Sequence, residues 1–314
     1  PSLSDQSRAM ESRQWGIGRG YWQLLVSAYL DCLARLKAGE KEAEAMRPQL
    51  GVLYGRLIGA LAARLKWDQF RYGPVDPEFW LNLGGTYLTA FDAKLDRKPL
   101  QLYTGAPETT IEAEYLKVLV FQATSMDKLK PLQIEIAEHL VAHFLPHFSL
   151  IRELRPENVY WVDAAKPVPP TRLAKLPEVS PTLRFFNGTQ ALEAVNETAE
   201  QIAKDRRVPP NINLGAQYDA DTVLPVLRHL AMYWAPKPPM RNTNRRRIAS
   251  PLKVVNGMTG VHRRLSGYGS DTEGVESWIV DDVSLGGLGA HATLSRAGWL
   301  RIGALVAVQP DGGD

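Results

Sequence analysis

The chain has 314 residues, enough for two domains of ordinary size, so two domains are expected. Hydrophobic residues make up 45% and charged residues 23%, values that exclude a disordered or collagen-like chain. The one cysteine, Cys32, excludes an intrachain disulfide framework, and a net charge of +3 is too small to indicate nucleic-acid or membrane binding by itself.

The sequence contains no segment that resembles a membrane span or a signal peptide. Charged residues such as Asp31, Arg56 and Arg64 interrupt the most apolar stretches before they reach about 18 residues. Residues 1–10 are polar and lack the apolar run of a secretory signal. With the low cysteine content, these features predict a cytoplasmic protein.

The segment from about residue 21 to 148 has the periodicity of helices. Leucines spaced by three and four line one face of the clearest example, whose members are Leu50, Leu53, Leu57, Leu61 and Leu65. Glycine and proline clusters separate it from similar segments at 21–36, 79–95, 112–122 and 132–145. Short connections favour antiparallel packing, so we expect a helical bundle.

Prolines interrupt the pattern between residues 156 and 181. Two β-like runs, 159–162 and 183–186, could pair as a small ribbon or hold the loop against the helices. Helices are predicted again at 189–206 and 222–233, and prolines 236, 238 and 239 end the last of them. We therefore place an all-α domain at residues 1–236 and a second domain at residues 237–314.

The second domain is predicted to be a small antiparallel β-barrel, which makes the whole chain an α+β protein. Short β-branched or aromatic runs at 252–255, 278–280, 288–294 and 299–308 alternate with glycines, and no helix is expected among them. Residues 241–265 contain seven basic residues and no acidic one, which favours an anionic ligand.

Two motifs mark this domain: R-N-T-N-R at residues 241–245 and D-V-S-L-G-G at residues 282–287. Together they resemble the RxxxR and [D/N]xSxxG signature of the PilZ family. The resemblance covers the C-terminal quarter of the chain, and the N-terminal helical region resembles no family that we can name. It implies a PilZ-type barrel that binds cyclic di-GMP, hence a non-enzymatic receptor with no cofactor and no metal.

The chemistry of the two motifs suits that ligand. Arginines can fork onto phosphate oxygens or the guanine edge and can stack on base faces. An aspartate can accept from guanine N–H groups, a serine can bond to base or phosphate, and a glycine allows close approach of the backbone. The predicted ligand-binding residues are Arg241, Arg245, Arg246, Asp282, Ser284 and Gly287.

Two alternatives remain open for the second domain. It could be a degenerate PilZ module that contacts only proteins, or its basic arm could bind nucleic acid, which the small net charge makes the weaker alternative. The helical domain is expected to contact a protein partner. The sequence does not identify this partner, the output process, the oligomeric state or the number of ligand molecules bound.

Three further patterns are better explained without a site. His139, His143 and His147 are spaced by four, but Pro146 is expected to end their helix, so we predict no metal. The segment 80–87 matches W-x-x-L-G-x-x-Y of a tetratricopeptide repeat once only, which favours core aromatics with a helix-packing glycine. The glycines of 16–20 follow no predicted strand, so a phosphate-binding loop is not expected there.

Overall fold

The structure is a computed structural model that describes residues 3–237, 244–266, 274–292, 299–300 and 304–310. The chain divides into two compact units, Pro1–Pro239 and Met240–Asp314. The described residues of each unit form their own hydrophobic core. Among the described residues, no helix combines the length and apolar character needed to cross a bilayer.

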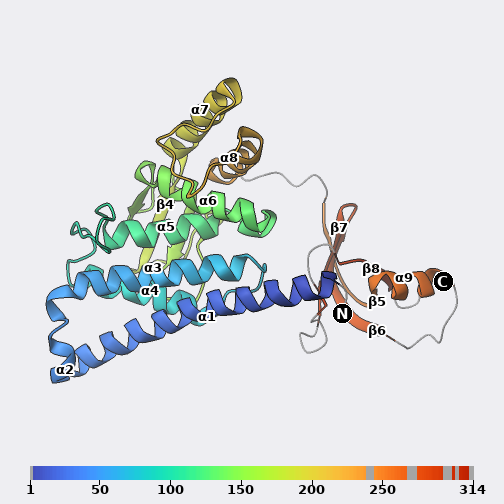
Figure 1. Cartoon of the computed structure of the whole chain (residues 1–314), viewed down its shortest axis with the longest axis horizontal. Helices are drawn as coiled ribbons and strands as arrows, with labels where there is room; N and C mark the ends of the chain where they lie inside the picture. Colours follow the sequence, from blue (N-terminus) through green and yellow to red (C-terminus); the bar gives the residue numbers. More distant parts are fainter. Residues whose placement is uncertain (1–2, 238–243, 267–273, 293–298, 301–303, 311–314) are drawn as a thin grey trace. The chain divides into compact units, whose positions relative to one another are not determined.

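The first unit is built mainly from helices (Figure 1). Several begin as their sequences predict: the side chains of Asp76, Thr110 and Asp219 each accept a hydrogen bond from a backbone amide of the first turn. The predicted helices of this region are confirmed, with ends shifted by a few residues in most cases. The helices are α1 (Leu3–Ala38), α2 (Lys41–Glu44), α3 (Leu50–Gln69), α4 (Pro77–Asp92), α5 (Ile111–Ala123), α6 (Pro131–Phe144), α7 (Thr189–Asp205) and α8 (Ala220–Trp234), with 3₁₀ turns η1 (Arg47–Gln49), η2 (Met126–Lys128) and η3 (Leu145–His147).

Helix α1 begins at Leu3, well before the position near residue 21 that the periodicity predicts. The prediction stopped short because glycines at 16, 18 and 20 lower helix propensity by about 1 kcal/mol each. Packing against the end of α3 offsets this cost. Gly18 lies against Trp67, Trp15 Nε1 donates to the Trp67 carbonyl at 2.6 Å, and Arg19 pairs with Asp68 at 2.5 Å. The glycine-rich segment is therefore helical and forms no loop.

The W-x-x-L-G-x-x-Y segment of α4 is core packing, as predicted. Trp80, Leu83 and Tyr87 are buried in the main core. A Cβ on Gly84 would lie 1.9 Å from the carbonyl oxygen of Ala164, so this glycine lets α4 pack directly on the backbone beside it. The segment thus serves close helix packing.

A small antiparallel sheet with strand order β1-β4-β2-β3 completes the first unit. The predicted ribbon is confirmed, since β2 pairs with β4 so that Tyr160 lies opposite Phe186. The first unit was predicted to be all-α, but it also contains this sheet. Strands β1 and β3 were not predicted, because strands of three and two residues are too short to show an alternation of apolar and polar residues. The strands are β1 (Ser149–Ile151), β2 (Tyr160–Asp163), β3 (Thr171–Arg172) and β4 (Leu183–Asn187).

The second unit is a curled antiparallel sheet, a half-barrel with strand order β7-β6-β5-β8. Its core is formed by Leu252, Val254 and Val280, with Trp278 and Trp299 packed against it. The predicted fold class, a helical N-terminal region followed by a small antiparallel β-structure, is confirmed. The strands are β5 (Arg246–Asn256), β6 (Val275–Ser284), β7 (Gly287–His291) and β8 (Val306–Pro310).

Two expectations for this unit were wrong. A helix, α9 (Gly257–Leu265), follows β5, where no helix was expected because Gly257 and Gly260 weaken the helical pattern. Gly260 packs against Val255 of β5, and Arg264 donates to Gln309 of β8, so tertiary contacts hold the helix. The basic segment after the prolines was expected to be an arm, yet from Arg246 onward it is strand β5, because it pairs with β6.

Candidate functional site

Two β-bulges lie side by side in the half-barrel. Between the paired positions Arg247–Asp282 and Ser250–Val280, β5 has two residues where β6 has one. That one residue of β6, Asp281, has no counterpart in β7. Bulges bend strands and redirect side chains, often at functional sites. Here they border an open hollow of about 460 Å³, lined by Arg247, Ile248, Ala249, Asp281 and Asp282.

The two predicted motifs meet beside this hollow. Arg245 Nη1 lies 2.9 Å from Asp282 Oδ1 and donates to Oδ2 at 3.1 Å. These residues are 37 positions apart in the sequence. Opposite Asp282 on β7 stands Gly289, where a Cβ would come within 3.1 Å of Oδ1, so the missing side chain leaves room for the carboxylate.

Both oxygens of the Asp282 carboxylate lie close to Arg245. Oδ2 accepts a hydrogen bond, and the buried Oδ1 lies at ion-pair distance but has no partner of hydrogen-bond geometry among the described residues. A donor from a ligand would therefore have to replace Arg245 at this carboxylate. The pair itself is partly exposed, with 43% of the Arg245 side chain and 25% of the Asp282 side chain accessible, and a competing anion can reach Arg245.

The D-V-S-L-G-G motif forms the tight turn that joins β6 to β7. Ser284 pairs with Gly287 across the turn, and its hydroxyl donates to the Gly287 carbonyl at 3.2 Å. The amide of Gly286 donates back to the Ser284 hydroxyl at 3.3 Å. Gly287 has φ of +146°, a conformation that side chains disfavour. Ser284 and Gly287 therefore shape the turn, which leaves Asp282 as the residue of this motif that faces the hollow.

The strand geometry separates the arginines onto two faces. Arg247 lies opposite Asp282, so their side chains share a face, whereas Arg246 lies opposite Val283 on the other face. Arg246 was predicted for the site and Arg247 was not, although it is Arg247 that lines the hollow. Side chains alternate between the two faces of a strand, so this alternation would have separated Arg246 from Arg247 if the segment had been predicted as a strand. Arg241 lies outside the described residues.

These groups give the site both signs of charge. Arg245 and Arg247 can donate to phosphate oxygens or stack on a base, and the Asp282 carboxylate can accept N–H groups if Arg245 releases it. The second carboxylate, that of Asp281, is already engaged: its Oδ2 lies 2.5 Å from His291 Nδ1. The arrangement suits a ligand that carries anionic groups and a donor edge together.

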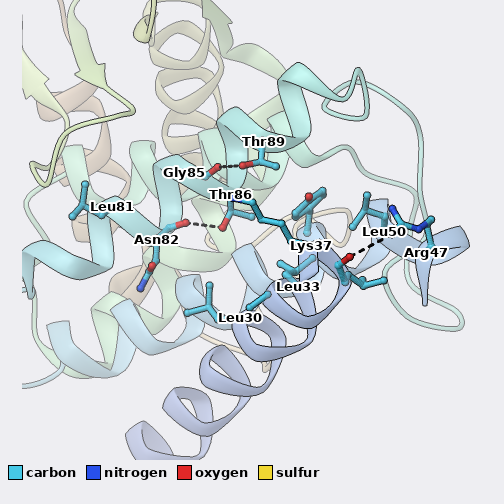
Figure 2. Close-up of a pocket in the computed structure, with 13 residues that line it drawn as sticks. Leu30, Leu33, Lys37, Arg47, Leu50, Leu81, Asn82, Gly85, Thr86 and Thr89 are labelled. Atoms are coloured by element: carbon cyan, nitrogen blue, oxygen red, sulfur yellow. Dashed lines mark hydrogen bonds between the residues drawn. The ribbon is translucent and has the colours of Figure 1, made fainter. Parts of the chain in front are cut away.

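A second hollow, of about 520 Å³, lies in the helical unit where α1, η1, α3 and α4 meet (Figure 2). The hydroxyls of Thr86 and Thr89 donate to carbonyls one turn earlier in α4, at 2.6 and 2.7 Å, so their hydrogens are already engaged. Arg47 is bound to Glu44 and to the Leu36 carbonyl. The lining is largely apolar and includes Leu30, Leu33, Leu50, Tyr54 and Leu81.

This groove does not fit a dinucleotide. Its one cation without an ion-pair partner among the described residues is Lys37, and a ligand with two phosphates and two bases needs several convergent polar groups. The groove is suited to apolar groups. The hollow in the second unit is the better candidate for a nucleotide.

The acidic groups of α6 are paired with a cation of the protein itself. Glu135, Glu138 and His139 bring their ligand atoms within 4.8 Å of one another. The Lys66 ammonium already lies 3.0 Å from Glu135 and 2.6 Å from Glu138, and it neutralises them. Hydrogen bonds to His139 and Lys66 lower the pKa of Glu135 to about 2. As predicted, α6 ends before Pro146, and His147 lies in η3.

Comparison with known proteins finds one family in the N-terminal half. Residues 2–156 match the family model described as "Cyclic-di-GMP receptor FimW, N-terminal domain". No curated protein and no solved structure was found to match the chain. The match supports a relationship with cyclic di-GMP receptors, and it lies in the helical region, not in the segment with the two motifs. It does not show a PilZ domain or a protein partner, and both stay predictions.

Proposed function

We propose that this chain is a cyclic di-GMP receptor and that the bulged region of β5 and β6 holds the ligand. The family match of residues 2–156 supports the ligand class. The observation that carries the location is the ion pair between Arg245 and Asp282, because it brings two distant motifs to the edge of one hollow. The half-barrel would then be a PilZ-type domain.

The geometry indicates an exchange of partners on binding. Without ligand, Asp282 neutralises Arg245 at 2.9 Å. A phosphate or guanine O6 that approaches Arg245 competes with the carboxylate, and the released carboxylate can accept from guanine N1–H and N2–H₂. Arg247, on the same face, would add a second cation, and Arg241 would add a third from the preceding segment. Ser284 and Gly287 would hold the turn that positions Asp282.

The proposal describes a non-enzymatic receptor. Binding of the ligand to the second unit would be the signal, and the helical unit would contact a protein partner in the cytoplasm. No cofactor or metal is required. The rival interpretations are a module that has lost the ligand and contacts only proteins, and a nucleic-acid binder that uses the basic segment.

A calorimetric titration of the full chain with cyclic di-GMP tests the proposal. Loss of a charge-assisted contact costs about 2–4 kcal/mol, so Arg245→Ala should weaken binding roughly 30- to 1000-fold, and Arg241→Ala should behave similarly. Arg207→Ala, an exposed arginine of the first unit, is the matched control and should bind like the parent. Arg247→Ala and Arg246→Ala decide which face is used. Unchanged binding in all four variants, at Arg241, Arg245, Arg246 and Arg247, would overturn the location.

Asp282→Ala tests the role of the carboxylate. Adenine presents an acceptor at N1 and has no 2-amino group, so the parent should reject cyclic di-AMP. In Asp282→Ala the affinity for cyclic di-GMP should fall while that for cyclic di-AMP changes little, which narrows the gap between them. A constant ratio of the two affinities would show that Asp282 only supports the turn.

Titration also separates the rivals. No heat of binding from cyclic di-GMP would favour the module that contacts only proteins. Binding of duplex DNA whose affinity falls steeply with salt would favour the nucleic-acid binder, since each phosphate contact releases counterions.

A further inference from the structure

The outer side of α1 carries a row of large apolar side chains that nothing in the described structure covers. Met10 is 60% exposed, Ile17 64%, Tyr21 56% and Leu24 72%. The helix packs on α3 through a different face, which includes the buried Val26 and Leu36. The exposed row is therefore a second apolar face of the same helix.

The spacing of this row is that of a coiled-coil seam. Its positions, 10, 17, 21, 24 and 28, recur at intervals of seven, four, three and four residues, and position 28 is the small residue Ala28. A helix that packs on the core needs one apolar face, and α1 has two. The second apolar face, the seam, therefore calls for a second helix. Tyr21 is held in place by an edge-on contact with Trp22, with ring centroids 5.1 Å apart.

The charges that border the seam favour one orientation of that second helix. Arg13 lies beside the seam near its start, and Asp31, seven residues after Leu24, continues the seam at its other end. In the described part of the chain neither has an ion-pair partner, and both are exposed. Two copies placed antiparallel bring Arg13 of each beside Asp31 of the other. Two parallel copies would place Asp31 against Asp31.

We propose that α1 pairs antiparallel with α1 of a second copy of this chain. In the register that overlaps the two seams, Tyr21 packs on Leu24 of the second copy, and Ile17 packs on Ala28 of the second copy. Both contacts and the Arg13–Asp31 pair occur twice by symmetry. Apolar side chains thus meet along the seam, and oppositely charged side chains pair at each end of it.

The size of the contact sets the expected strength. In this register the two seams overlap from residue 14 to residue 31, over about 26 Å, and a helix is about 10 Å wide, so each copy contributes on the order of 260 Å² in projection. This lies below the usual range of specific interfaces, about 800 Å² per partner, even after side-chain relief is added. We therefore expect a dimer with a dissociation constant in the micromolar range, about 1–50 µM.

Analytical ultracentrifugation of the full chain from about 1 to 100 µM tests the dimer. The parent should pass from monomer to dimer, and Leu24→Glu should stay monomeric with an unchanged circular dichroism spectrum, since this side chain is 72% exposed. Leu176→Glu is the matched control, because Leu176 is 75% exposed in the same unit, and it should dimerise like the parent. A parent that is monomeric at every concentration, or two leucine variants that behave alike, would overturn the proposal.

Charge reversal tests the orientation. Arg13→Glu and Asp31→Arg should each raise the dissociation constant roughly 5- to 10-fold, because each breaks two symmetric ion pairs. The two substitutions combined should restore the parent value, since the pair re-forms with its signs exchanged. A double variant that is weaker than either single variant would overturn the antiparallel arrangement.

Discussion

Gly84→Ala is expected to destabilise the first unit, although the same exchange stabilises most helices. Alanine would gain up to about 1 kcal/mol of helix propensity in the middle of α4. Its Cβ, however, would lie 1.9 Å from the Ala164 carbonyl oxygen and 2.8 Å from the carbonyl carbon. These are backbone atoms, so α4 must move away. Overpacking of this kind costs about 3 kcal/mol at the upper end, which leaves a net loss of about 2 kcal/mol.

Urea unfolding followed by circular dichroism measures this loss, and the neighbouring glycine supplies the control. A Cβ on Gly85 would have no atom within 4 Å, so Gly85→Ala should stabilise the same helix by about 0.5–1 kcal/mol. Opposite signs at adjacent positions of one helix are the signature of the backbone contact. If Gly84→Ala were as stable as Gly85→Ala, the close approach of α4 to the Ala164 backbone would be refuted.

Three further predictions concern single contacts. Arg172→Ala should lower the unfolding free energy by about 1–3 kcal/mol and speed hydrogen exchange at the end of α8. The reason is that the guanidinium donates to carbonyls at the end of this helix and just after it. Unchanged hydrogen exchange would contradict this role. The pKa of Glu135 is lowered to about 2, so the ionised side chain stabilises the fold above the unfolded pKa of 4.5, and this stabilisation is lost as the pH falls toward 2. In Glu135→Gln the free energy of unfolding by urea should therefore change by about 1 kcal/mol less over this pH range than in the parent. An unchanged pH profile would exclude the effect. Glu276→Ala should speed hydrogen exchange in β5 and β6, because Glu276 accepts from the indoles of Trp278 and Trp299 at 3.0 and 2.7 Å; exchange equal to that of the parent would show that the indoles need no acceptor.

The sequence alone predicted the helices and strands that have a clear local pattern of residues. The leucine spacing of residues 50–65 predicted α3, because a helix places such residues on one face. The ribbon of residues 159–162 with 183–186 followed from β-propensity. The motifs at 241–245 and 282–287 predict an anionic ligand with N–H donors, because arginine and aspartate suit such groups whatever the fold around them, and this stays a prediction.

Tertiary structure decided the features that depend on neighbours distant in the chain. The glycines of α1 and α9 weaken helices locally, and packing on Trp67 and on Val255 restores them. Only the pairing of β5 with β6 could show that Arg247 and not Arg246 shares a face with Asp282, since a one-residue change of register moves every side chain to the other face. The Asp282 carboxylate likewise fits beside β7 because Gly289, on that strand, leaves the space for its Oδ1.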